Sequence, residues 1–189
     1  MIYALGCILV FAAFLFVDLI TKAFAHAANV QQTDYFLGLF KLNYRKNPGM
    51  MLSIFDKNYT AMVIVTILTV LMIIGIAALF FTIFKRNKPA QMTLAIIEAG
   101  AIGNLVDRLY FWGLTGHGYV RDFLTVRKIL FFPEYTCNIA DIYILFGAIA
   151  LIFIILFIGK HAVFPLTKKW REEAKLEEEK KEKSRKKSK

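Results

Sequence analysis

The sequence predicts an all-α membrane protein with four transmembrane helices and a small extracytoplasmic β cradle. Two observations predict this fold: 58% of the 189 residues are hydrophobic, with a mean hydropathy of +0.53, and four long apolar segments are separated by polar stretches. Such a composition is too apolar for a soluble domain with a single core. We expect a membrane domain over residues 1–166 and a charged cytoplasmic tail over residues 167–189.

The first apolar segment, residues 1–17, is slightly shorter than the roughly 20 residues that a helix needs to cross a bilayer. We therefore expect the helix to continue past Asp18. A cleaved signal peptide is the alternative. No Lys or Arg precedes the segment, and no clear small-residue cleavage site follows it, so the sequence favours a retained span.

The segment from residue 31 to residue 57 has a different periodicity. Apolar and polar residues alternate from Phe40 to Arg45, which is the period of a β-strand. The following Asn47-Pro48-Gly49 is typical of a turn. Because this segment is too polar to cross a membrane, we expect a small β element at the surface.

Three further spans follow, over residues 60–84, 90–106 and 142–158. The second of these contains one interior charge, Glu98. Residues 110–135, between the last two spans, are rich in aromatic residues and glycine and are predicted to be a loop. Beyond Leu166 the chain alternates basic and acidic blocks, which indicates an exposed, frayed helix or disorder.

The charge distribution predicts the orientation. Formal net charge is +10, and the short segment 85–88 and the C-terminal tail are both strongly basic. Basic segments stay in the cytoplasm, so both termini are expected there and the loops 23–59 and 109–137 outside. The first outer loop is also basic, which is the contrary observation. No groove-reading motif accompanies the charge, so we expect no nucleic-acid partner.

Polar residues collect at the ends of the apolar segments that this topology places outside. Charges near hydrocarbon are costly, so such residues indicate a functional site. A further acid, Asp122, lies in the last loop. The residues at the segment ends are Asp18, Asp107, Arg108, Asn138 and Asp141.

The spacing on the third span indicates how it packs. Gly100, Asn104 and Arg108 recur every four residues and share one helix face. Gly100 permits close approach of another backbone, and Asn104 can form hydrogen bonds across helices. Asp107 and Arg108 are adjacent and therefore point in different directions, so they need not pair. Both are alternatively simple anchors of a helix end.

Two of the acids can form an aspartyl dyad. Two carboxyl groups held close together cannot both ionise easily, so one keeps its proton at neutral pH while the other accepts one from water. This is the chemistry of metal-free peptide hydrolysis. The sequence leaves open which acids meet, but Asp122 and Asp141 are the most economical pair, because a loop can fold its acid back onto the next helix. Asn138 and Asp141 share a face near a helix N-terminus, which favours an anion.

No metal or cofactor is expected. Cys7 and Cys137 have no metal-ligand spacing, and the chain contains no HExxH pattern. Two of the acids also have simpler interpretations. Asp18 can form an interfacial ion pair with Lys22. Glu98 can pair with a neighbour inside the bundle or lie near the cytoplasmic end of its helix.

Five short segments, in order along the chain, resemble the motifs of the lipoprotein signal peptidase (signal peptidase II) family. Residues 18–22 resemble DxxTK, 47–51 resemble NxGAA, 103–108 resemble GNxxDR, 120–123 resemble VxDF and 138–141 resemble NxAD. Each motif alone is weak, but five in order on a chain with four predicted spans are highly specific.

The resemblance implies a function and a set of site residues. It implies a membrane aspartyl endopeptidase that removes the signal peptide of diacylglyceryl-modified prolipoproteins, cutting just before the lipidated cysteine. Asp122 and Asp141 would be the catalytic dyad. Residues that bind or orient the substrate and the dyad would be Asn47, Asn104, Arg108, Asn138, Asp18, Lys22 and Asp107.

The resemblance also implies the setting of the reaction. The enzyme would lie in the bacterial cytoplasmic (inner) membrane as a multi-pass protein, with its active site at the outer face. It would need no cofactor, would contact membrane lipid, would act as a monomer and would be inhibited by globomycin. The family's β cradle and lid helix would match residues 34–56 and the loop between.

The chain departs from the family pattern at a few positions. Met50-Met51-Leu52 replaces a small pair and an aromatic residue, Cys137 stands where Phe often precedes the Asn, Ile142 follows Asp141 where a small polar residue is common, and Glu98 replaces an often small residue. The dyad is intact, so these differences concern the shape of the pocket. The charged tail has no counterpart in the family's core.

Two function classes other than a peptidase remain. A small transporter or proton-relay subunit also carries intramembrane acids, but it needs polar groups through the depth of the membrane. The predicted span over residues 60–84 is uncharged, which disfavours a transporter or proton relay. A membrane chaperone that binds signal helices without cutting would tolerate Asp141→Asn. A different aspartyl intramembrane protease is disfavoured because the chain contains no GxGD motif.

Overall fold

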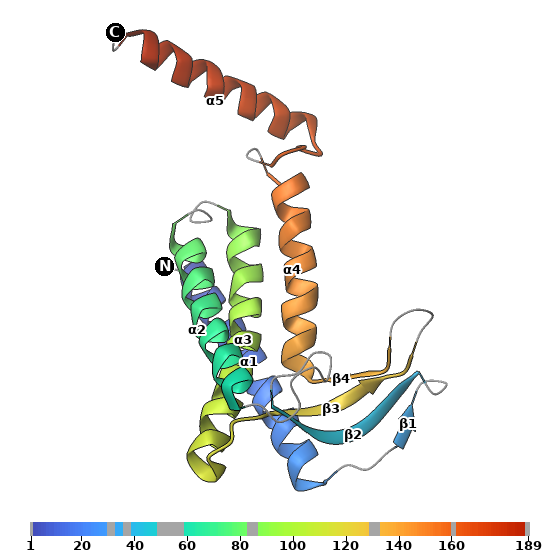
Figure 1. Cartoon of the computed structure of the whole chain (residues 1–189). Coiled ribbons are helices and arrows are strands. Elements are labelled where there is room, and N and C mark those ends of the chain that lie inside the picture. The colour runs from blue at the N-terminus through green and yellow to red at the C-terminus, as the bar shows by residue number, and fades with distance from the viewer. Residues whose placement is uncertain are drawn as a thin grey trace.

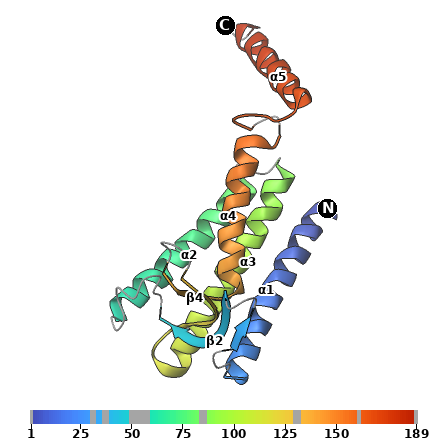
Figure 2. The same ribbon diagram turned by 90° about the vertical axis from the view of Figure 1, so that its right-hand side faces the viewer.

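The computed structural model describes residues 2–29, 33–35, 39–48, 59–82, 87–128, 133–159 and 162–187. Four long helices form a bundle, a small sheet lies at one end of it, and a fifth helix extends from the other end (Figures 1 and 2). Residues 49–56, which include the substituted segment Met50-Met51-Leu52 and the end of the range matched to the cradle and lid, and part of the basic segment 85–88 lie outside the described residues.

Among the described residues, three helices are long and apolar enough to cross a membrane. They are α1 (Ile2–Ala27), α2 (Tyr59–Phe81) and α4 (Ile139–Phe157). The helix α1 continues well past Asp18, as its short apolar run predicts. The helix α4 begins three residues before the predicted span, because the side chain of Asn138 caps its first turn.

The helix α3 (Lys88–Thr115) is the centre of the bundle: α1, α2 and α4 all pack against it. The Asn87 side chain accepts a hydrogen bond from the Ala90 N–H at 3.1 Å and so caps its start. It ends at Gly116, whose φ of 71° is a left-handed conformation that suits glycine. The helix runs nine residues beyond the predicted end at 106, so the start of the predicted loop is helical. The helix α3 is less apolar than α1, α2 and α4 and is not one of the three candidate spans.

The polar loops contribute a four-stranded antiparallel sheet in the order β1-β2-β3-β4. The strand β2 (Phe40–Asn47) confirms the alternating pattern, and β1 (Thr33–Tyr35) pairs with it. The strands β3 (Val120–Val126) and β4 (Tyr135–Cys137) correct the prediction of a loop over 110–135. The sequence pattern did not indicate β3 as a strand, because β3 is largely buried and its apolar and polar residues do not alternate regularly.

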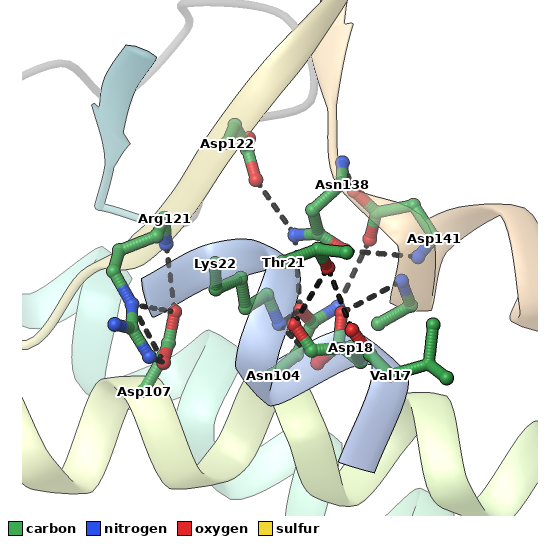
Figure 3. A network of polar contacts seen from close by, with 11 residues as sticks. Val17, Asp18, Thr21, Lys22, Asn104, Asp107, Arg121, Asp122, Asn138 and Asp141 are labelled. Carbon is green, nitrogen blue, oxygen red and sulfur yellow. Dashed lines mark hydrogen bonds and ion pairs between the residues drawn. The ribbon is translucent and has the colours of Figure 1, made fainter. Parts of the chain in front are cut away.

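The register of the sheet brings the two outer segments together. Arg45 of β2 lies opposite Asp122 of β3, and Leu124 of β3 lies opposite Cys137 of β4. The strand β3 also contacts α1 and α3. As a result, the sheet places Asp122 next to Asn138, at the start of α4 (Figure 3).

The charged tail forms a helix, α5 (Lys168–Lys187), which is the first of the two predicted possibilities. It points away from the bundle (Figures 1 and 2). Its first turn is tied to the preceding link by Arg171, whose Nε donates to the Pro165 carbonyl at 2.9 Å. The division at residue 166 stays a prediction.

Candidate functional site

A buried ion pair within α1 contacts the start of α4. Lys22 Nζ lies 2.7 Å from Asp18 Oδ2, and both side chains are fully buried. Asp18 Oδ1 accepts a hydrogen bond from the Ala140 N–H, at 3.0 Å, in the first turn of α4. That N–H has no partner within its own helix, and the helix dipole favours an anion there. The predicted ion pair is therefore present, but it is internal rather than interfacial.

Two glycines of α3 allow this close packing. A Cβ atom on Gly103 would lie 2.2 Å from Asp18 Oδ2, and one on Gly100 would lie 2.7 Å from the Ala140 carbonyl oxygen. No larger side chain fits at either position without displacing its neighbour. The prediction that Gly100 permits a close backbone approach is confirmed.

Asn104 links three helices. Its Oδ1 accepts from Lys22 Nζ at 2.8 Å and from Asn138 Nδ2 at 3.1 Å. Because both donors occupy the oxygen, the amide nitrogen faces the other way, and it donates to Asp141 Oδ1 at 2.9 Å. The lysine thus fixes the orientation of the amide and, through it, one oxygen of Asp141. The predicted hydrogen bonding of Asn104 across helices is confirmed.

Asn138 and Asp141 form a reciprocal cap at the start of α4. Asn138 Oδ1 accepts from the Asp141 N–H, and Asp141 Oδ2 accepts from the Asn138 N–H, both at 3.1 Å. Such a capping box satisfies two backbone donors at once. Asp141 is therefore held at both oxygens, one by Asn104 and one by the backbone, although it remains partly exposed.

Asp122 reaches the same asparagine from the sheet. Its Oδ1 accepts from Asn138 Nδ2 and its Oδ2 accepts from Asn47 Nδ2, each at 2.7 Å. The residue is only 1% exposed. Burial, reinforced by the negative charge of Asp141, raises the pKa of Asp122 to about 7. Figure 3 shows the two acids on either side of Asn138, one from β3 and one from α4.

Asp107 lies apart from this network and anchors β3. It is fully buried and accepts from Arg121 three times: from Nη2 at 2.7 Å, from Nε at 3.1 Å and from the backbone N–H at 2.9 Å. Sequence reasoning did not select Arg121, although it directly precedes Asp122 in the VxDF segment. The clamp fixes both the backbone and the side chain of the residue next to Asp122 (Figure 3).

Arg108 occupies a different position from its neighbour, as their adjacency predicts. It is 8% exposed, and its Nη1 donates to Thr69 Oγ1 of α2 at 3.3 Å. Its Nε has no partner among the described residues. Within the same described part of the chain, no group of three or more His, Cys, Asp and Glu side chains is arranged to hold a metal ion.

Comparison with known proteins identifies the family. The family model described as signal peptidase (SPase) II matches residues 10–157. A lipoprotein signal peptidase of Clostridium novyi is 30% identical over 147 residues, which are 76% of this chain and 92% of that protein. A second, from Caldicellulosiruptor bescii, is 33% identical over 149 residues, covering 78% and 88%.

The fold agrees with this. A solved structure of a bacterial membrane enzyme superposes with a TM-score of 0.67 at 24% identity, covering 80% of this chain and 87% of that one. Fold and sequence together define a bacterial multi-pass membrane protein of the aspartic peptidase class. The chain belongs to the signal peptidase II family, the lipoprotein signal peptidases, which remove the signal peptides of prolipoproteins. The resemblance based on the five motifs is thereby confirmed.

Proposed function

We propose that this enzyme cuts diacylglyceryl-modified prolipoproteins just before the lipidated cysteine, with Asp122 and Asp141 as the catalytic dyad. One observation carries the assignment: the two carboxyl groups, from a strand and from a helix, are both held through Asn138. The raised pKa of Asp122 supports a carboxyl group that keeps its proton in this site.

The geometry suggests a role for each acid. Asp141 is partly exposed, and its two oxygens accept hydrogen bonds from Asn104 and from the Asn138 N–H, so we assign it the role of the base. Asp122 is buried with a pKa of about 7 and acts as the acid. Asp141 takes a proton from water, the water oxygen bonds to the scissile carbonyl carbon, and Asp122 gives its proton to the carbonyl oxygen. The C–N bond of the resulting tetrahedral intermediate then breaks, and the proton held by Asp141 passes to the leaving amine. One hydroxyl of the intermediate returns its proton to Asp122 as the new carboxyl group forms.

The remaining predicted site residues act on the dyad at different ranges. Asn104, Asn138 and Asn47 contact the carboxyl groups directly and orient them. The pair of Asp18 and Lys22 acts through Asn104 and through the start of α4. Two others act from further away.

Asp107 acts through Arg121 on the strand that carries Asp122. Arg108 is buried with a free donor, Nε, within the described part of the chain. It suits a role in binding a substrate carbonyl rather than in holding the dyad.

We also propose that α3 is the fourth span. Its polar residues face the helices packed around it rather than lipid, which is how intramembrane polar groups are tolerated. Four spans put the basic segment 85–88 and the charged tail on one side, the cytoplasm, and the sheet with the dyad at the outer face. The enzyme would lie in the bacterial cytoplasmic membrane, act as a monomer without a cofactor, and be inhibited by globomycin.

A cleavage assay with two substrates tests this function. The purified enzyme is given a diacylated prolipoprotein and the same protein without the lipid, each in the presence of a chelator. Cleavage of the lipidated form only, before its cysteine, is the expected result. Equal cleavage of both forms would refute the lipid dependence. Binding without cleavage by folded enzyme would instead favour the chaperone alternative.

A further inference from the structure

A hollow in the bundle lies away from the dyad. It is a cavity of about 290 Å³ between α1, α2 and α3, and its walls are almost entirely apolar. Both α1 and α2 pack on α3, and the cavity lies where the three meet. The lining residues that matter here are Cys7 and Phe11 of α1, Ala77 and Phe80 of α2, and Leu94 and Glu98 of α3.

Glu98 is the one ionisable carboxyl in this lining. Its Oε2 is buried and has no hydrogen-bond partner among the described residues. A buried polar atom without a partner is costly, and native proteins rarely leave one. The residue takes no part in the network around Asn138, so the mechanism above does not use it. An ionisable group inside a membrane protein indicates an interaction site.

The depth of Glu98 restricts what can pair with it. It lies ten residues from the start of α3 at Lys88, which is about 15 Å along the helix and half the thickness of a bilayer core of roughly 30 Å. Lipid acyl chains carry no hydrogen-bond donor at that depth, and there is no water. Lipid can therefore fill the cavity but leaves the carboxyl oxygen unpaired. A side chain on another membrane-crossing helix can reach it.

The three apolar spans of a second copy of this chain do not supply such a side chain from their described residues. The large exposed side chains along the middle of the three apolar spans are aliphatic or aromatic, as in Leu9, Leu71 and Ile149. The residues of α2 that line the cavity are all apolar. Thr66 and Thr69 lie further along α2, and both donate to carbonyls of their own helix.

We propose that this cavity docks a transmembrane helix of another membrane protein, one that carries a side-chain amide near its middle. An amide both donates and accepts hydrogen bonds, so it matches a carboxyl group without bringing a second charge into the hydrocarbon. The apolar walls hold the helix by packing, and Glu98 selects for the amide. This inference does not depend on the proposed cleavage chemistry.

Two synthetic helices test the proposal. One is a leucine–alanine transmembrane peptide with a single central Asn, and the other is identical except for a central Leu. Binding to the full-length protein in lipid vesicles is measured by energy transfer between attached dyes. We expect the Asn peptide to bind about 3- to 30-fold more tightly, the range measured for interhelical hydrogen bonds. Equal binding of the two peptides to wild type would overturn the proposal.

Variants locate the contact. Glu98→Leu should abolish the preference for the Asn peptide, and Glu98→Gln should keep it. Ala77→Phe fills the cavity and should weaken binding of both peptides. A preference that survives in Glu98→Leu would place the binding elsewhere. Cleavage of a lipidated substrate by Glu98→Leu should be unchanged, which separates this site from the dyad.

Discussion

Replacing Gly103 by Ala is expected to disrupt the buried pair of Asp18 and Lys22 from the opposite helix. The added Cβ would lie 2.2 Å from Asp18 Oδ2 and 3.1 Å from its Cγ. The carboxylate is fully buried and contacts Lys22 at 2.7 Å and the Ala140 N–H at 3.0 Å. It cannot move aside without lengthening both hydrogen bonds.

The expected cost follows from those two contacts. Hydrogen bonds to charged groups contribute roughly 1.5–3 kcal/mol each, and the higher helix propensity of Ala returns about 1 kcal/mol. The net loss in the free energy of unfolding is therefore about 2–5 kcal/mol. For a chain of this size each kcal/mol lowers Tm by about 2–4 °C, so a decrease of roughly 5–15 °C is expected. Cleavage should also fall, because Lys22 orients Asn104, which holds Asp141.

Gly113→Ala provides the matched control on the same helix. A Cβ there has no heavy atom within 4 Å, so the variant should be as stable as wild type or slightly more stable. The assay is thermal unfolding in detergent for wild type and both variants, followed by cleavage of a lipidated substrate. A Gly103→Ala protein with the Tm and activity of Gly113→Ala would refute the reasoning.

Four further predictions concern the dyad, the Asp107–Arg121 contact and the tail. Because the pKa of Asp122 is raised to about 7, kcat/KM should fall as pH rises through about 7 and the acid loses its proton. A pH profile that stays flat to pH 9 would contradict the assigned role. The neutral form is favoured in the folded state, so wild-type stability should decrease from about pH 4 towards pH 7, and Asp122→Asn should lose this part of the dependence in Tm measurements across pH. Asp107→Asn leaves Arg121 without its charged partner and should lower the free energy of unfolding by about 3 kcal/mol. It should also lower kcat more than it raises KM. An unchanged kcat would show that the Asp107–Arg121 contact does not position β3. Removing the tail after Leu166 should leave cleavage in detergent largely intact, and loss of activity with normal expression would contradict that.

The sequence predicts the elements whose pattern is local. Alternation from Phe40 to Arg45 predicts β2, and the spacing of Gly100 and Asn104 predicts a face that contacts other helices. The economical pairing of Asp122 with Asp141 agrees with the shared contact at Asn138. These predictions need only the period of the element and the length of a loop.

Contacts across the chain could not be predicted in this way. The contact of Asp18 with the Ala140 N–H joins residues 122 positions apart and depends on the exact height of two helices. The contact of Arg121 with Asp107 depends on β3, a strand in a segment whose aromatic and glycine content predicts a loop. The helix α3 extends past the apolar run because Asp107 and Arg108 are buried against other elements rather than exposed to water.

The central claim is that Asp122 and Asp141 together perform the cleavage, and a side-by-side assay tests it most directly. Wild type, Asp122→Asn and Asp141→Asn are purified, checked for folding by thermal unfolding, and given one diacylated prolipoprotein with chelator present. Each Asn keeps the shape of the acid but cannot exchange the proton. Both variants should bind the substrate and leave it uncut while wild type releases the signal peptide. Substantial turnover by either folded variant would contradict the dyad.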